Sequence, residues 1–259
     1  MEIKIIDNFK IVFSNMKYEE SKELRDFLSG TTIIDFLKKL DKNIIIVLGG
    51  DGTMLEAVHE FFTENKAFLG INFGHKGFLM NDLNILKNKL NLKKNSYPLL
   101  SCKYFGDEKV FLNEIDISSC FGRMANLKIS LGNNYSLDLI GDGLIISSPI
   151  GSSGYNVSLG GPIIPHNLET FVLSPKAPWK PTKQSPMLID NKEKITIKLN
   201  NPESKVDIYG DGVLFKQVRD FEKEIIIQKS QKNVDLYFNY TDDSYPYFKV
   251  LQEQGFSKI

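Results

Sequence analysis

A buried-strand pattern that ends abruptly in a glycine turn constrains this chain more than any other feature. Residues 44–48 (Ile-Ile-Ile-Val-Leu) are apolar and mostly β-branched, and Gly49-Gly50-Asp51-Gly52-Thr53 follows them directly. Apolar residues at helical spacing continue from Met54 to Phe62, which predicts a strand, a turn and a helix in succession. Such a turn directs backbone N–H groups and a helix N-terminus at one point, which suits a phosphate.

The carboxylate of Asp51 in the middle of this turn favours one chemistry over another. Beside a bound phosphate, a carboxylate is electrostatically costly unless it accepts a proton or orients a cation. The turn therefore favours phosphoryl transfer over phosphate storage. The alternative is structural, because strand-to-helix turns use Gly and Asp for conformational freedom and capping. The sequence has no P-loop pattern, and no G-x-G-x-x-G fingerprint follows a strand.

Charge and hydropathy exclude several classes of protein. Lys plus Arg and Asp plus Glu number 32 each in 259 residues, and without clustered basic charge no nucleic-acid partner is expected. Charges at Glu2, Lys4 and Asp7 interrupt the apolar core that a signal peptide needs, and no apolar run is long enough to span a membrane. Cys102 and Cys120 belong to no Cys/His cluster. We therefore expect reduced thiols and a cytoplasmic protein without membrane contact.

The order of the expected elements divides the chain into two domains. Residues 1–96 alternate strand and helix patterns, which predicts an α/β domain with a parallel sheet and helices on its faces. The polar, proline-containing segment 92–98 is typical of a domain boundary. Strand patterns separated by turns fill residues 97–240 and predict a mainly antiparallel, all-β domain. A last helix is expected at 245–254, with residues 241–259 returning to pack on the first domain.

Three further segments carry glycine and polar residues at strand ends. The strand pattern that reaches Gly70 runs into a glycine-punctuated loop up to Leu79, and parallel topology predicts that this loop and the Asp51 turn flank one crevice. Residues 141–162 combine Gly-Asp-Gly with Ser, Tyr, Asn and two prolines, which predicts a shaped ligand loop. A third Gly-Asp-Gly, at 210–212, lies between two β runs and is predicted to be only a hairpin turn.

Two consecutive polar residues, Asn113 and Glu114, interrupt an apolar strand pattern that runs from Phe111 to Ile117. Side-chain alternation predicts that one of them faces the core, and a buried Glu is rare unless it is paired or binds a ligand. Neighbouring donor and acceptor groups of this kind suit the diol of a ribose. A structural hydrogen-bonded pair is the alternative.

Taken together, these motifs resemble those of the NAD kinase family. The resemblance covers residues 44–162 in the family's order: the signature turn (49–53), the second glycine motif (70–79), the Asn-Glu pair (112–114) and the longest motif (142–162). Gly154 stands where the family usually has Ala, and Ser148 and Ser153 stand where Thr is common. These departures are mild and remove no expected catalytic group.

The resemblance implies phosphorylation of the adenosine ribose 2′-hydroxyl of NAD by ATP or polyphosphate, giving NADP. It implies a divalent cation, Mg²⁺, carried with the nucleotide and not held by fixed protein ligands. It also implies an N-terminal domain that binds nucleotide and phosphate, and a β domain that binds NAD and forms a homodimer or homotetramer. The site is expected to lie between the domains.

The resemblance also assigns residues to these roles. Asp51 would orient or deprotonate the 2′-hydroxyl. The donor phosphates would be bound by Gly49, Gly50, Gly52 and Thr53. NAD would be bound by Gly52, Phe73, Asn113, Glu114, Asp142, Ser153, Gly154 and Tyr155. Asp142 would reach the site of a neighbouring subunit.

Two other functions remain open from the sequence. A lipid or sugar kinase with the same glycine turn would explain Asp51, but not the Asn113-Glu114 pair. An NAD-binding sensor would keep the fold without turnover. Unpaired strand edges in a β domain favour self-association, and four aromatic residues are expected to add surface for it: Phe105, Phe111, Phe121 and Tyr135.

Overall fold

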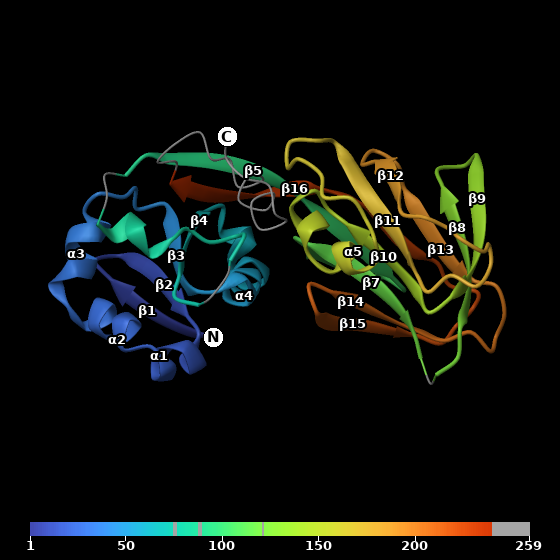
Figure 1. The fold of residues 1–259 in the computed structure, drawn as a ribbon, viewed down its shortest axis with the longest axis horizontal. Helices are drawn as coiled ribbons and strands as arrows, with labels where there is room; N and C mark the ends of the chain where they lie inside the picture. Colours follow the sequence, from blue (N-terminus) through green and yellow to red (C-terminus); the bar gives the residue numbers. More distant parts are fainter. Residues whose placement is uncertain (75–76, 88–89, 121, 240–259) are drawn as a thin grey trace. The chain divides into compact units, whose positions relative to one another are not determined.

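The computed structural model describes residues 1–74, 77–87, 90–120 and 122–239 of the chain (Figure 1). Two compact units divide it: the first comprises Met1–Tyr97 with residues 234–239, and the second comprises Pro98–Asn233. The helix expected at 245–254, and the return of 241–259, lie outside the described residues. Among the described residues, no helix is long and apolar enough to cross a membrane.

A mostly parallel sheet forms the centre of the first unit (Figure 1). Its strands are β1 (Glu2–Ile6), β2 (Phe9–Phe13), β3 (Ile44–Gly49), β4 (Ala67–Asn72) and the end of β16 (Ile225–Asn239). β2, β3 and β4 pair in parallel, whereas β1 pairs antiparallel to β2. Beyond β4, Leu236 of β16 pairs in parallel with Phe68. The predicted parallel α/β sheet is confirmed.

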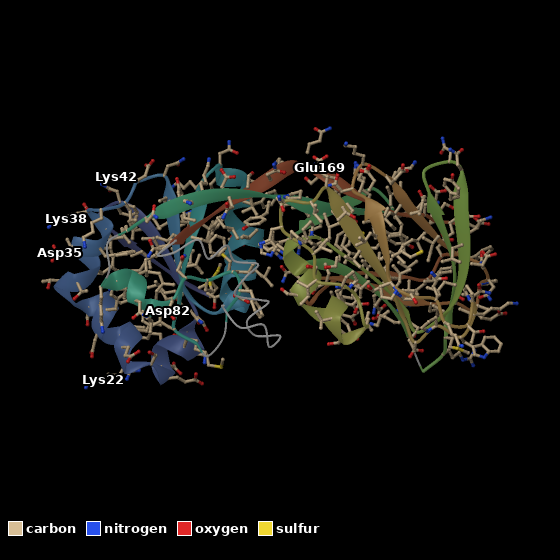
Figure 2. The ribbon with its side chains drawn as sticks, turned by 45° about the horizontal axis from the view of Figure 1, so that its top comes forward. Lys22, Asp35, Lys38, Lys42, Asp82 and Glu169 are labelled. Atoms are coloured by element: carbon tan, nitrogen blue, oxygen red, sulfur yellow. The ribbon has the colours of Figure 1, made fainter. Side chains whose placement is uncertain are left out.

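Helices cover both faces of this sheet. They are α1 (Asn15–Glu20), α2 (Lys22–Ser29), α3 (Thr31–Leu37) and α4 (Asp51–Phe61), with short 3₁₀ turns η1 (Phe62–Glu64) and η2 (Leu83–Leu86). Apolar residues of α2 and α3 share a core with alternate residues of β3, and α4 contacts β2 and β3. All six residues of β3 are therefore buried, as expected of a central parallel strand. Charged side chains such as Lys22, Asp35 and Lys38 lie on the outer side of α2 and α3 (Figure 2).

The apolar spacing of residues 19–28 predicts one helix with Leu24, Phe27 and Leu28 inward, but the structure has two helices there. Ser21 ends α1 and begins α2, because its hydroxyl oxygen accepts the backbone N–H of Leu24 at 3.1 Å. Serine favours this capping position because its side chain satisfies an N–H that has no intrahelical acceptor. The inward residues of α2 are nevertheless the expected ones, Leu24, Phe27 and Leu28.

Two β-sheets pack face to face in the second unit, and antiparallel pairing dominates it. One sheet has the order β12 (Met187–Asp190), β11 (Thr170–Lys176), β10 (Gly143–Ser147), β7 (Glu114–Ser119), β14 (Val206–Gly210) and β15 (Val213–Val218). The other contains the start of β16 with β13 (Ile195–Leu199), β8 (Ala125–Leu131), β9 (Tyr135–Gly141), β5 (Leu92–Tyr104) and β6 (Asp107–Phe111). Short helices η3 (Ile150–Ser153) and α5 (Tyr155–Ser158) follow β10. The predicted antiparallel β domain is confirmed.

The boundary expected in residues 92–98 falls between Tyr97 and Pro98, where the two units divide, although β5 runs through it continuously from Leu92 to Tyr104. Two expectations about the second half are wrong in detail. The apolar pattern of residues 137–147 predicts one strand, but this run breaks at Asp142 into β9 and β10, which belong to different sheets. Phe111 adds no surface, since it is fully buried in the core of this unit.

Candidate active site

The strand-to-helix turn of the first unit is shorter than the sequence predicts. Gly50 alone separates β3 from α4, and the helix begins at Asp51. The first intrahelical hydrogen bond runs from the N–H of Met54 to the carbonyl oxygen of Gly50, at 3.1 Å. The N–H groups of Gly52 and Thr53 therefore have no acceptor within the helix, and the helix dipole adds positive potential. A phosphate would be stabilised at this end.

The glycines of this turn have two different environments. A Cβ at Gly49 would lie 2.5 Å from Oγ1 of Thr53, so glycine there lets β3 pack against the first helical turn, where Thr53 is buried. At Gly50 and Gly52 an added Cβ would meet no described atom within 4 Å. The fold does not require glycine at positions 50 and 52, and the space beside them is open to a ligand.

The carboxylate of Asp51 joins the two glycine-containing loops. Its Oδ2 accepts the backbone N–H of Phe78 and its Oδ1 accepts that of Leu79, each at 2.9 Å. The prediction that these two loops lie together at the carboxyl ends of β3 and β4 is confirmed. Two hydrogen bonds from consecutive amides also orient the carboxylate, so Asp51 has a structural role in addition to any chemical one.

Phe73 lies where the ends of β3 and β4 meet. Its N–H donates to the carbonyl oxygen of Gly49 at 2.9 Å, and its half-buried ring packs against Phe27 with the centroids 6.0 Å apart. Farther along the loop, the buried Asn81 side chain donates to the carbonyl oxygens of Gly70 and Tyr237. This part of the loop is therefore fastened to the sheet of the first unit. His75 lies outside the described residues.

In the second unit, Asn113 lies in a break between β6 and β7 rather than inside one strand. The alternation argument that placed Asn113 and Glu114 in a continuous strand is therefore wrong. At this break, three consecutive backbone N–H groups donate to the carboxylate of Asp211. Its Oδ2 accepts from Leu112 at 2.8 Å, and its Oδ1 accepts from Asn113 at 2.8 Å and from Glu114 at 3.1 Å. The hairpin turn predicted at 210–212 is confirmed, whereas this second role of Asp211 was not predicted.

Both side chains at the break present buried atoms that lack a partner. Oδ1 of Asn113 and Oε2 of Glu114 are buried and make no hydrogen bond within the described part of the chain. Burial raises the pKa of Glu114 from 4.5 to about 8, and the charges of Asp211 and Asp116 add to the effect. Glu114 is therefore mostly protonated at neutral pH and can donate a hydrogen bond. Buried polar atoms without partners are costly, so this arrangement suits a polar ligand.

The loop after β10 is rigidly hydrogen-bonded, as a shaped ligand loop requires. Ser148 Oγ donates to the carbonyl oxygen of Leu112 at 2.6 Å, and the Ser148 N–H donates to that of Asn113 at 2.8 Å. The Asn156 amide donates to the carbonyl oxygen of Ser152 at 2.9 Å, and Ser152 Oγ accepts the N–H of Ile164 at 3.1 Å. These bonds hold the loop directly against the Asn113 break.

Gly154 and Tyr155 lie in this loop beside the Asn-Glu pair. A Cβ added at Gly154 would lie 3.3 Å from Oε2 of Glu114, which brings these two predicted residues together. The half-exposed ring of Tyr155 has Nζ of Lys176 5.1 Å from its centroid. That ammonium donates to both carboxylate oxygens of Asp116, at 2.9 and 3.0 Å. Sequence reasoning missed Lys176 and Asp116, because 60 residues separate them along the chain.

Asp142 does not join the other predicted residues of the second unit. It lies exposed between β9 and β10, at the crossing from one sheet to the other. Gly143 follows with φ +128°, and a Cβ there would lie 1.9 Å from the carbonyl oxygen of Ile117, so only glycine permits this crossing. In β10, Ser147 pairs with Glu114 and Gly143 pairs with Ser118. Asp142 is thus about 13 Å or more from the Glu114 end of the strand pair.

The raised pKa of Glu114 predicts a pH-dependent stability effect. Because protonation is favoured in the folded state, the stability that this group contributes is fully present below pH 4.5 and is lost as pH rises through about 8. Glu114→Gln removes this loss. The measured quantity is the free energy of unfolding of the variant minus that of the wild type. We expect this difference to be about 2–4 kcal/mol more favourable to the variant at pH 9 than at pH 5.

Denaturant titrations at the two pH values measure this difference. Glu108→Gln is the control, because the hydroxyl of Ser101 lowers the pKa of Glu108 from 4.5. The stability that Glu108 contributes is lost only below about pH 4.5, so the effect of this variant should be nearly the same at pH 5 and pH 9. Equal effects of Glu114→Gln at pH 5 and pH 9 would show that Glu114 is ionised in the folded protein.

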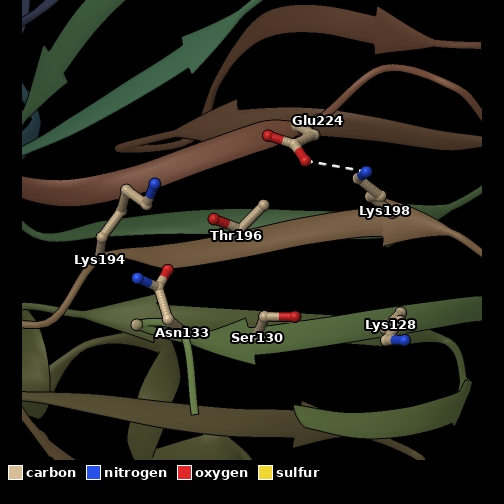
Figure 3. A pocket seen from close by; sticks show the side chains of 8 residues that line it. Lys128, Ser130, Asn133, Lys194, Thr196, Lys198 and Glu224 are labelled. Atoms are coloured by element: carbon tan, nitrogen blue, oxygen red, sulfur yellow. Dashed lines mark ion pairs between the residues drawn. The ribbon is translucent and has the colours of Figure 1, made fainter. Parts of the chain in front are cut away.

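A hollow of about 340 Å³ on the second unit is lined by none of these residues. It is lined by Lys128, Ser130, Gly132, Asn133, Lys194, Thr196, Lys198 and Glu224, on the polar side of β8 and β13 (Figure 3). Lys198 pairs with Glu224 at 2.8 Å. Its lysines are exposed, and it contains none of the predicted site residues. It is therefore not the candidate active site.

Comparison with known proteins identifies the family. The ATP-NAD kinase N-terminal domain matches residues 10–84, and the ATP-NAD kinase C-terminal domain matches residues 113–238. An NAD kinase of Clostridium perfringens is 32% identical over 252 residues, which cover 92% of this chain and 87% of that protein. The chain belongs to the NAD kinase family. An NAD kinase of Blochmanniella floridana is 34% identical over 229 residues, covering 81% of this chain and 74% of that protein.

Solved structures of NAD kinases share the fold. An NAD kinase from Archaeoglobus fulgidus in complex with ATP has a TM-score of 0.72 at 22% identity, over 94% of this chain and 96% of that one. A yeast NADH kinase complexed with NADH has a TM-score of 0.71 at 21% identity, over 84% and 67%. The family resemblance of the motifs is confirmed. As an NAD kinase family member, the chain is an enzyme that phosphorylates NAD to NADP, which argues against a lipid or sugar kinase and a non-catalytic sensor.

Proposed function

We propose that this enzyme uses ATP, with Mg²⁺, to phosphorylate the adenosine ribose 2′-hydroxyl of NAD. The observation that carries the proposal is the N-terminus of α4, where the open glycines 50 and 52 leave backbone N–H groups accessible beside the Asp51 carboxylate. Phosphate oxygens would accept from these amides. The Archaeoglobus fulgidus relative, solved in complex with ATP, supports the choice of donor.

In the first unit, Asp51 would accept the proton of the 2′-hydroxyl as that oxygen attacks the γ-phosphorus of ATP. The P–O bond to ADP breaks, and the bonding pair leaves with ADP. Gly50 and Gly52 would hold the donor phosphates. Gly49 and Thr53 pack against each other and would keep the turn in shape. Gly52 and Phe73 would also contact NAD.

In the second unit, Asn113 and Glu114 would hold the dinucleotide through the buried Oδ1 and Oε2 atoms that lack partners. Protonated Glu114 would donate a hydrogen bond to NAD, whereas Oδ1 of Asn113 would accept one. Ser153, Gly154 and Tyr155 would line the same part of the site. Lys176, held by Asp116, would keep the ring of Tyr155 in place.

Mg²⁺ would arrive on the phosphates of ATP. Among the described residues, no three His, Cys, Asp or Glu side chains gather closely enough to hold a metal ion. Mg²⁺ at such sites is commonly bound by substrate phosphates with one or two carboxylates, and Asp51 is the carboxylate nearest the phosphate-binding turn. When bound, the ion neutralises charge on the transferred phosphoryl group.

We also propose a homodimer or homotetramer formed through the second unit. Asp142 is exposed beside Gly143 at one end of β10, whereas Glu114 pairs with Ser147 at the other end. Asp142 would therefore act in the NAD site of a neighbouring subunit and not in its own. Phe105 and Tyr135 are 72% and 75% exposed and would be covered in the assembly. The cytoplasmic location stays a prediction from the sequence.

Incubating the purified chain with NAD and Mg-ATP tests the choice of donor and metal. We expect NADP, measured with an NADP-specific dehydrogenase, and we expect EDTA to abolish its formation because the phosphoryl charge is then unshielded. Parallel reactions contain polyphosphate in place of ATP, and NADH in place of NAD. NADP formation from polyphosphate but not from ATP, or undiminished by EDTA, would contradict the proposal.

A further inference from the structure

Asp211 occupies the first position of a two-residue hairpin turn that does not need a carboxylate. Its φ is +49° and that of Gly212 is +79°, the positive values that a type I′ turn requires at both central positions. Asn or Gly adopts this conformation at least as readily as Asp. The turn between β1 and β2 has the same geometry, with Asp7 at φ +48° and Asn8 at +66°. The turn therefore allows Asp at this position but does not require its carboxylate.

The Asp211 carboxylate instead satisfies three backbone amides of a distant segment. The N–H groups of Leu112, Asn113 and Glu114 donate to it over 2.8–3.1 Å, and the N–H of Asp211 donates back to the carbonyl oxygen of Glu114 at 3.1 Å. These amides lie where β6 ends and β7 begins. Hydrogen bonds to a charged acceptor are roughly twice as strong as neutral ones, so this cluster fixes the backbone on both sides of Asn113.

We propose that Asp211 is a positioning residue for NAD: its carboxylate sets the backbone from which Asn113 and Glu114 reach the dinucleotide, and does not touch NAD itself. This inference rests on the proposed role of those two residues. The negative charge of Asp211 also faces Glu114, together with Asp116 of β7, whose own charge is paired with Lys176 of β11. Asp211 therefore helps to keep Glu114 protonated.

Asp211→Asn tests the proposal, with Asp7→Asn as the matched control. Both changes replace Asp by Asn at the first position of a two-residue turn, and Asn suits a positive φ. Of these two carboxylates, only that of Asp211 accepts backbone amides of another segment within the described residues. We expect Asp211→Asn to raise the KM for NAD about tenfold, with kcat and the KM for ATP changed less than threefold. Asp7→Asn should leave all three unchanged.

Amide hydrogen exchange separates this inference from the proposed function. In the wild-type enzyme the amides of residues 112–114 should be protected, and Asp211→Asn should speed their exchange at least tenfold. Rapid exchange in the wild type, or an unchanged exchange rate in the variant, would overturn the positioning role whatever the KM for NAD is. An unchanged KM for NAD with accelerated exchange would also overturn it. If Asp211→Asn does not fold, Asp211→Gly, which also suits the turn, takes its place.

A further control tests the NAD site itself. Asn113→Ala keeps the backbone and the Asp211 contacts but removes the side chain. If this variant binds NAD as tightly as wild type by calorimetry, the proposed role of Asn113 fails, while the exchange measurement still decides whether Asp211 holds the segment.

Discussion

Asp51→Asn is expected to lower kcat for NADP formation by about 10²–10⁴-fold, because the amide keeps the size of the side chain but removes the oxygen that would accept the 2′-hydroxyl proton. NAD affinity, measured by calorimetry, should change little. Steady-state kinetics with saturating ATP and NAD gives kcat directly. A variant with undiminished kcat would show that Asp51 only shapes the turn.

The contacts of Asp51 require a control for structural effects. Asparagine can accept only through Oδ1, so its Nδ2 would face one of the two N–H groups, of Phe78 or Leu79, that now donate to the carboxylate. Asp82→Asn makes the same chemical change at another carboxylate of this loop (Figure 2). There, Oδ1 of Asp82 accepts the N–H of Asn84 at 2.9 Å.

The two variants distinguish a proton acceptor from a structural group. If Asp51 is the proton acceptor, Asp51→Asn loses kcat far beyond any change in its Tm, and Asp82→Asn keeps kcat. If Asp51 acts only by holding the loop, the loss of kcat in Asp51→Asn should be small and should be accompanied by a lower Tm. The KM for ATP should then rise as well.

What could be predicted from the sequence was local. The strand, glycine turn and helix around Asp51 follow from a period of apolar residues and from turn chemistry within about ten residues, and the structure differs only in the length of the turn. The pairing of β14 and β15 around Gly210-Asp211-Gly212 was predictable for the same reason. Each of these features depends on neighbours in the chain.

What could not be predicted depends on contacts between distant segments. Asn113 was expected within one strand, but the chain breaks there because Asp211, 98 residues away, supplies the acceptor that strand pairing would otherwise provide. The Asp116–Lys176 pair likewise joins β7 to β11 across β10. Asp142 lies in an apolar run that was expected to form one strand, yet it marks a crossing between sheets. No period or turn preference carries such information.

The same distinction applies to Glu114, which the sequence identifies as a candidate site residue but whose raised pKa it does not predict. A polar pair in an apolar pattern is visible in the sequence, and the buried atoms without partners bear out its unusual character. The raised pKa requires more, because it combines burial with the charges of Asp211 and Asp116. A residue can therefore be selected from its sequence context while its protonation state depends on the fold.

Gly52→Val is expected to lower activity with ATP without lowering the thermal stability of the protein. A Cβ at position 52 meets no described atom within 4 Å, and glycine is a poorer helix former than valine, so the Tm should stay the same or rise. The valine methyl groups would instead fill the space beside the N–H groups that are proposed to hold the donor phosphates. Losing one charge-assisted hydrogen bond and the close approach should lower kcat/KM for ATP about 10²-fold.

Gly49→Ala is the informative contrast, because its new Cβ would lie 2.5 Å from Oγ1 of Thr53. Overpacking of this kind costs about 1–3 kcal/mol, so this variant should lose Tm together with activity. Thermal unfolding and kinetics with varied ATP, run on both variants, give the comparison. If Gly52→Val keeps wild-type kcat/KM for ATP, the donor phosphates do not approach the N-terminus of α4. A fall in its Tm matching that of Gly49→Ala would instead mean that position 52 packs within the fold and is not open to a ligand.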